Sequence, residues 1–132
     1  MKPTVLLFHL APEKHAPLMA TAARLQIQVK HVPPAQSGQT LSALLGLSPL
    51  DEDAAGGEMQ QEMMVMADFT RRMMDDFLGG LRALGMKPIR LKAVVTPTNM
   101  DWTADALCRE LSEEAAAMVR SRAAQESEGK PR

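Results

Sequence analysis

The sequence predicts an α+β domain built on a four-stranded sheet, and two observations carry this prediction. The runs Thr4–Leu10 and Met63–Ala67 are almost continuously apolar, as strands buried on both faces are. The stretches Leu25–Lys30 and Ile89–Val95 alternate apolar and polar residues, which is typical of half-exposed strands. With the continuous strands inside and the alternating strands at the edges, the spatial order is 4-1-3-2. This is a ferredoxin-like split βαβ sheet with a short extra helix and a C-terminal helix.

The alternative is a small three-layer parallel α/β sheet, because the same elements permit it. A ferredoxin-like sheet covers only one face with its two helices, so continuously apolar interior strands need a second cover. The short helix over Leu41–Leu47, the C-terminal helix or another subunit would each supply it.

Helical patterns fill the segments between the strands. One helix is expected over His15–Leu25, and Thr40 is a suitable cap for the short helix that follows. A third helix starts near Thr70 and ends before Gly85, which suits a left-handed cap. Gly79-Gly80 in its middle costs about 1 kcal/mol per glycine against alanine, so it indicates a close backbone approach or a tolerated weakness.

The last helix follows a polar junction, Thr96–Trp102, which contains the only tryptophan. Thr98 and Asp101 form a capping-box-like pair, with aspartate in place of the usual glutamate. If the helix begins there, Trp102 lies about 140° from Leu107, almost opposite the apolar stripe. A tryptophan in that position suits packing within the chain, an interface between subunits, or a ligand. The stripe consists of Met100, Ala104, Leu107, Leu111, Ala115 and Met118.

Length and composition bound the organisation of the chain. Its 132 residues suit a single domain over residues 1–122, followed by a polar tail, residues 123–132, that we expect to be disordered. Fifteen basic and sixteen acidic residues leave no global field for nucleic acid or an anionic membrane. The lone Cys108 excludes an internal disulfide and suits a reducing cytoplasm. The apolar run near the N-terminus is too short for a signal sequence or a membrane span.

The junction is the candidate site for a ligand or partner. It lies between the carboxyl end of a strand and the N-terminus of a helix, where free N–H groups favour anions. A simple helix cap at Thr98 or Asn99 explains the same residues without a ligand. The predicted binding residues are Lys92, Thr96, Thr98, Asn99 and Trp102.

No pattern predicts a catalytic residue, a cofactor or a metal. His9, His15 and His31 have no ligand spacing, and Cys108 has no signature that pairs it with a histidine. The glycine pairs lack the spacing of a phosphate-binding loop. RNA recognition on such a sheet needs aromatic residues on the interior strands, and Phe8 is the only one there.

The string LKAVVTPTNMDWTADALCREL at residues 91–111, with QTLSALLGL and MMVMADFT upstream, resembles domain-of-unknown-function family 3783, an uncharacterised bacterial family. The resemblance spans Val5 to Met118 and is most specific from Leu91 through Trp102. It implies a small bacterial cytoplasmic α/β protein and no reaction.

From these patterns we expect a non-enzymatic module that acts by self-association, or by binding a protein partner or a small ligand. The alternative is an enzyme that uses residues 96–102 as an anion or carbonyl site.

Overall fold

The computed structural model describes residues 1–129, with side chains through Gln125. Its strands and α-helices follow the predicted order closely. They are β1 (Thr4–Phe8), α1 (His15–Arg24), β2 (Gln28–His31), α2 (Leu41–Leu44), β3 (Met63–Ala67), α3 (Arg71–Ala83), β4 (Leu91–Val94) and α4 (Ala104–Gly129), with short 3-10 turns at Pro12–Lys14 and Pro34–Gln36.

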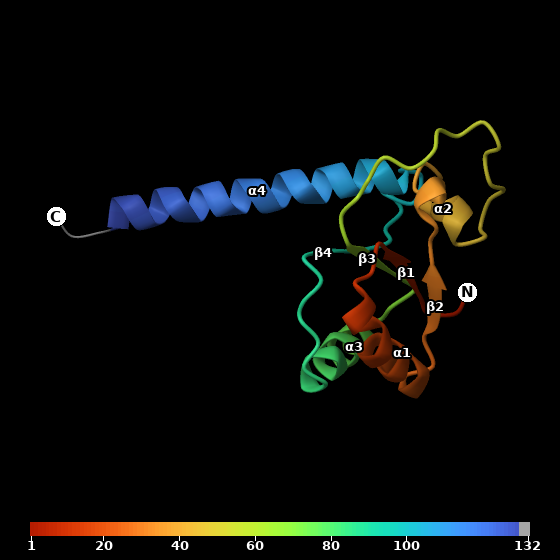
Figure 1. The fold of residues 1–132 in the computed structure, drawn as a ribbon, viewed down its shortest axis with the longest axis horizontal. Helices are drawn as coiled ribbons and strands as arrows, with labels where there is room; N and C mark the ends of the chain where they lie inside the picture. The colour runs from red at the N-terminus through yellow and green to blue at the C-terminus, as the bar shows by residue number, and fades with distance from the viewer. Residues whose placement is uncertain (130–132) are drawn as a thin grey trace.

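The four strands form one mixed sheet in the order β2-β1-β3-β4 (Figure 1). β1 pairs with β2 and β3 pairs with β4 in parallel, whereas the two central strands are antiparallel. The prediction that β1 and β3 are the interior strands is therefore confirmed. The predicted order 4-1-3-2 of a ferredoxin-like sheet is wrong, because β2 lies beside β1 and β4 lies beside β3. Both edge strands alternate apolar and polar residues, so this pattern could not tell which of them neighbours which interior strand.

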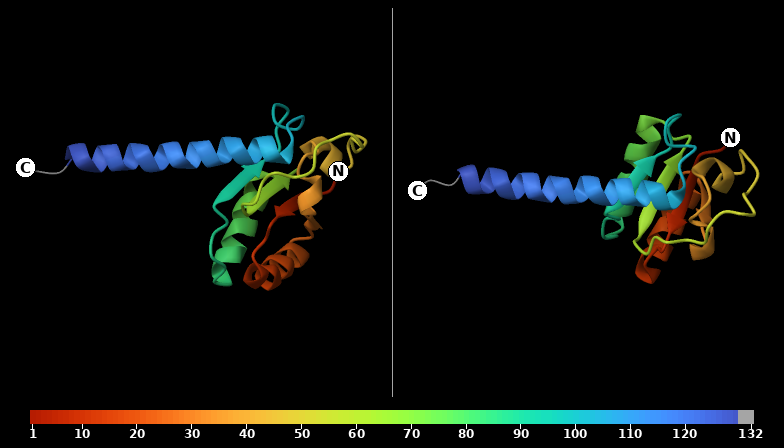
Figure 2. Two further views of the ribbon diagram at one scale, coloured as in Figure 1. Left: turned by 45° about the horizontal axis from the view of Figure 1, so that its top comes forward. Right: turned by 90° about the horizontal axis from the view of Figure 1, so that it is seen from above.

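Helices cover both faces of the sheet, so the molecule has three layers (Figure 2). Alternate residues of the central strands point to opposite faces. Val5 and Met64 pack with α1 and α3 on one side, while Leu6 and Met63 pack with α2 and α4 on the other. The predicted second cover is confirmed. The alternative fold has the right number of layers, but the sheet is mixed rather than parallel.

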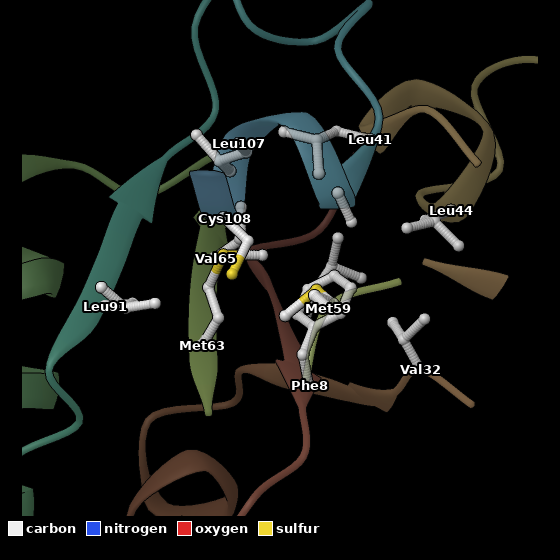
Figure 3. Close-up of a cluster of buried hydrophobic side chains, with 12 residues drawn as sticks. Phe8, Val32, Leu41, Leu44, Met59, Met63, Val65, Leu91, Leu107 and Cys108 are labelled. Carbon is white, nitrogen blue, oxygen red and sulfur yellow. The ribbon is translucent and has the colours of Figure 1, made fainter. Parts of the chain in front are cut away.

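The cluster beneath α2 and α4 is apolar and closely filled. Leu107 and Cys108 of α4 are buried in one cluster with Met63 and Val65 of β3, and Cys108 lies beside Val65 (Figure 3). Leu41 and Leu44 bring α2 onto the same cluster beside Phe8 and Val32. The first turns of α4 are thus part of the core.

The two helices on the other face lie close together at α3's second glycine. A Cβ atom built on Gly80 would lie 2.8 Å from Thr21 Cγ2 of α1, whereas one on Gly79 would meet nothing within 4 Å. The predicted close approach is therefore confirmed for Gly80. Thr70 caps α3 by accepting a hydrogen bond from the Met73 N–H, and Gly85 has a φ of 76°, as its predicted left-handed cap requires.

α4 is 26 residues long, about 39 Å at 1.5 Å per residue, and most of it extends beyond the sheet (Figures 1 and 2). The predicted tail begins inside this helix, since residues 123–129 continue it; residues 130–132 lie outside the described residues. Over residues 1–129, none of the helices has both the length and the apolar character needed to cross a bilayer.

Candidate functional site

In the junction after β4, the polar side chains of Thr96 and Asn99 form hydrogen bonds within the turn itself. The Thr96 N–H donates to Asn99 Oδ1 at 2.8 Å, and the Asn99 N–H donates back to Thr96 Oγ1 at 3.1 Å. Asn99 Nδ2 also donates to the Val94 carbonyl at 3.0 Å, and this side chain is buried. Thr98 is exposed at the tip of the turn. The two polar side chains that define the turn are therefore engaged within it.

The start of α4 differs from the predicted one. Thr103 is the cap, because its Oγ1 accepts a hydrogen bond from the Ala106 N–H at 3.1 Å. Thr98 and Asp101 both precede the helix, so the predicted capping pair is wrong. The next N–H groups are also taken: Ala104 donates to the Gln39 carbonyl at 3.1 Å and Asp105 donates to the Ser37 carbonyl at 3.0 Å. An anion at this helix end would need those donors.

Trp102 lies outside the helix, so the predicted angle of 140° does not apply to it. Its half-buried indole packs against the core cluster beneath α2 and α4. Its carbonyl accepts a hydrogen bond from the Leu41 N–H at 2.9 Å, and the neighbouring Thr103 forms an isolated antiparallel β-bridge with Thr40. These contacts attach the junction to α2. Packing within the chain accounts for the indole's position.

Lys92 is not gathered with the other predicted site residues. Its Nζ donates to the Ile89 carbonyl at 2.7 Å, toward the start of β4 and away from the junction. It lines a cavity of about 290 Å³ to which no junction residue contributes. The five predicted residues therefore belong to separate environments, and their binding role stays a prediction.

Asp105, in the first turn of α4, is a residue that the sequence patterns missed. It is 7% exposed and accepts hydrogen bonds from Ser37 Oγ at 2.7 Å and from the N–H groups of Met59 and Glu58 at 3.0 and 3.1 Å. Burial acts to raise the pKa of this carboxyl, but the hydrogen bonds from Ser37, Met59 and Glu58 outweigh it and lower the pKa. An acidic residue in a first helical turn is the only local signal, and it says nothing of partners so distant in sequence.

Cys108 is unsuited to nucleophilic chemistry. Its side chain is buried, and its Sγ lies 3.0 Å from Gln61 Oε1, to which it donates. Burial raises the pKa of the Cys108 thiol, and the nearby Asp105 charge adds to this effect. Because the thiolate is the reactive form, the thiol is held in its inert state.

The histidines form no metal site. The rings of His15 and His31 stack at a centroid distance of 5.0 Å, and His9 Nε2 lies 3.0 Å from the Met59 carbonyl. In the described part of the chain, no group of three or more histidine, cysteine, aspartate or glutamate residues is arranged to hold a metal ion.

The projecting part of α4 carries exposed apolar side chains. Ala104, Leu107 and Cys108 of the helix are buried against the sheet. Farther along the helix, which extends away from the sheet (Figure 2), Met118 and Val119 are 59% and 62% exposed. Met118 belongs to the apolar stripe, so the stripe continues past the part of the helix that is buried against the sheet.

The family model described as Domain of unknown function (DUF3783) matches residues 62–118. This segment runs from the start of β3 through α3 and β4 into the middle of α4. The predicted resemblance is confirmed for it, while residues 5–61 lie outside the match. No curated protein and no solved structure matches the chain.

Proposed function

We propose that this chain is a non-enzymatic interaction module that self-associates through the projecting half of α4. The observation that carries the proposal is the exposure of Met118, which is 59% exposed on a helix whose earlier turns are core. Helices in water gain most of their stability from packing an apolar face. A second copy of the same helix would supply that packing.

The proposed contact face follows from helical geometry. At about 100° per residue, Met118 and Arg122 lie within about 20° of Leu111, and Ala115 lies about 40° away. Leu111 is packed against the core cluster, so the face begins inside the domain and continues outward. The small side chain of Ala115 permits close approach of a second helix.

The charges on this segment favour an antiparallel pair. Glu114 lies about 60° from Leu111, at the edge of the proposed face, and Arg122 lies near its centre. In an antiparallel pair centred on Met118, residue 114 of one copy lies opposite residue 122 of the other, four positions on each side. Each acid then lies at the same level as a base on the other copy, within reach of their long side chains, whereas a parallel pair in register would place like charges at the same level.

The remaining chemistry supports an interaction role over catalysis. The Asp105 carboxylate is occupied by three hydrogen bonds, and the Cys108 thiol is buried with a raised pKa. The N–H groups of Ala104 and Asp105 are used within the chain. A cytoplasmic location and a bacterial source stay predictions, the first from the single cysteine.

Sedimentation velocity on the full chain tests the proposal. We expect a dimer at micromolar concentration and a monomer for Met118→Glu, because residue 118 faces its own copy at the midpoint of the pair and the substitution places two like charges there. Met19→Glu is the matched control, since Met19 is 46% exposed on α1 and should leave the dimer intact. A parent chain that stays monomeric at hundreds of micromolar would refute self-association.

A further inference from the structure

The cavity that contains Lys92 lies at the β4 edge of the sheet, on the face covered by α3. Met64, Leu81 and Ile89 line it and are almost completely buried. Leu78 of α3 and Met86 of the following turn also contribute. The cavity therefore has an apolar interior, as small-molecule sites do.

Two cations contribute to the same cavity. Arg82 comes from the last turns of α3, and Lys92 comes from β4. Lys92 gives one hydrogen bond to the Ile89 carbonyl, so its ammonium group keeps two further donors. Among residues 1–125, no carboxylate oxygen lies within ion-pair distance of either side chain. Two unpaired positive charges beside an apolar cavity are complementary to a molecule with an apolar body and an anionic head.

We infer that this cavity binds a small amphiphilic anion. The apolar body lies against Leu81 and Ile89, and the head group, a carboxylate or a phosphate, lies between Arg82 and Lys92. The volume of about 290 Å³ sets the size. At roughly 30 Å³ per atom, the share of one water molecule in the liquid, it holds about ten non-hydrogen atoms. Octanoate has about this size.

Amide chemical shifts of the isotopically labelled full chain, titrated with octanoate, test the inference. We expect saturable shifts of the Leu81, Ile89 and Lys92 amides, with residues of α1 unaffected. Octanol should bind about tenfold more weakly, because it lacks the charge that the two cations recognise. A parallel titration with octyl phosphate identifies the preferred head group, and saturable binding of either anion at these amides supports the site.

Charge-removing variants connect binding to the two cations. Arg82→Gln should weaken octanoate binding about tenfold, and Lys92→Gln should do the same. Lys87→Gln is the matched control, since Lys87 is exposed nearby and does not line the cavity. Because Lys92 also bonds to the Ile89 carbonyl, the melting temperature of each variant is measured first, and Arg82→Gln decides the result if the Lys92 variant is unstable. The inference would be overturned if neither anion shifted the amides around the cavity selectively. It would also be overturned if the parent bound octanol as tightly as octanoate and Arg82→Gln bound octanoate as tightly as the parent.

Discussion

Replacing Asp105 with alanine should destabilise the fold strongly, because this carboxylate joins three segments that are distant in sequence. It lies on α4 and accepts hydrogen bonds from Ser37, before α2, and from the N–H groups of Glu58 and Met59, before β3. Glu58 is an exposed residue, so its N–H group can bond to water instead, but Met59 and Ser37 are buried. Alanine leaves these two buried donors facing an empty acceptor position.

The magnitude follows from those two donors. Leaving the buried Met59 N–H unsatisfied costs about 1–3 kcal/mol. Removing the charged partner of the Ser37 hydroxyl would cost about as much. The second cost is smaller here because Ser37 Oγ also lies 3.2 Å from the Pro34 carbonyl, which can accept the hydrogen bond instead. Loss of a negative charge from the first helical turn adds about 0.3–1 kcal/mol. Removing the carboxylate also relieves its own desolvation. We therefore expect a loss of about 3 kcal/mol, or a melting temperature lower by roughly 10 °C.

Urea unfolding at neutral pH measures this loss, with Asp101→Ala as control because Asp101 is exposed before the helix. The pKa of Asp105 is lowered in the folded chain, so its contribution is complete above the unfolded-state pKa of about 3.9 and disappears as the pH falls through the folded-state value. The difference between parent and Asp105→Ala should thus shrink below about pH 4. Equal stabilities for the two alanine variants at pH 7 would refute the reasoning.

Three further predictions each compare two variants, or the native with the unfolded chain. Gly79→Ala should stabilise the chain by up to about 1 kcal/mol, whereas Gly80→Ala should destabilise it because a methyl group there meets α1; urea unfolding of both variants measures the difference in sign. Thr103→Ala should cost about 1 kcal/mol in the same assay and Thr98→Ala less than 0.5, since only Thr103 caps α4; equal losses would contradict this assignment. Cys108 should react with iodoacetamide slowly in the native chain and rapidly in urea, because burial protects the thiol and raises its pKa. Mass spectrometry measures the extent of alkylation over time, and fast alkylation of the native chain would count against burial of the thiol.

The layers of the fold could be predicted because local patterns reflect burial directly. The continuous runs at Thr4–Leu10 and Met63–Ala67 became β1 and β3, Thr40 caps α2 as expected, and α3 starts next to Thr70 as predicted. The neighbours of the edge strands could not be predicted, since an alternating pattern reports exposure on one face and not the identity of the adjacent strand.

The candidate site was harder to predict because its contacts are distant in sequence. The pair Thr98 and Asp101 matches a capping box, yet Thr103 is the cap, and the hydrogen bonds with residues 37–42 that hold the junction are absent from any local pattern. Asp105 is missed for the same reason. Lys92 was grouped with the junction residues, whereas the cavity that it lines depends on α3, which only the three-dimensional fold places there.

The proposed self-association is tested most directly by exchanging the charges of Glu114 and Arg122, with sedimentation equilibrium as the readout. Glu114→Arg and Arg122→Glu should each weaken the dimer, because each places two like-charged pairs across the antiparallel helices. The double variant restores both pairs with reversed polarity, so we predict dimerisation close to that of the parent. Glu113→Arg, on the opposite side of α4, should have little effect. The antiparallel pairing through α4 would be contradicted if the double variant lost as much dimerisation free energy as the two single variants together. It would also be contradicted if Glu113→Arg weakened the dimer as much as the single variants do.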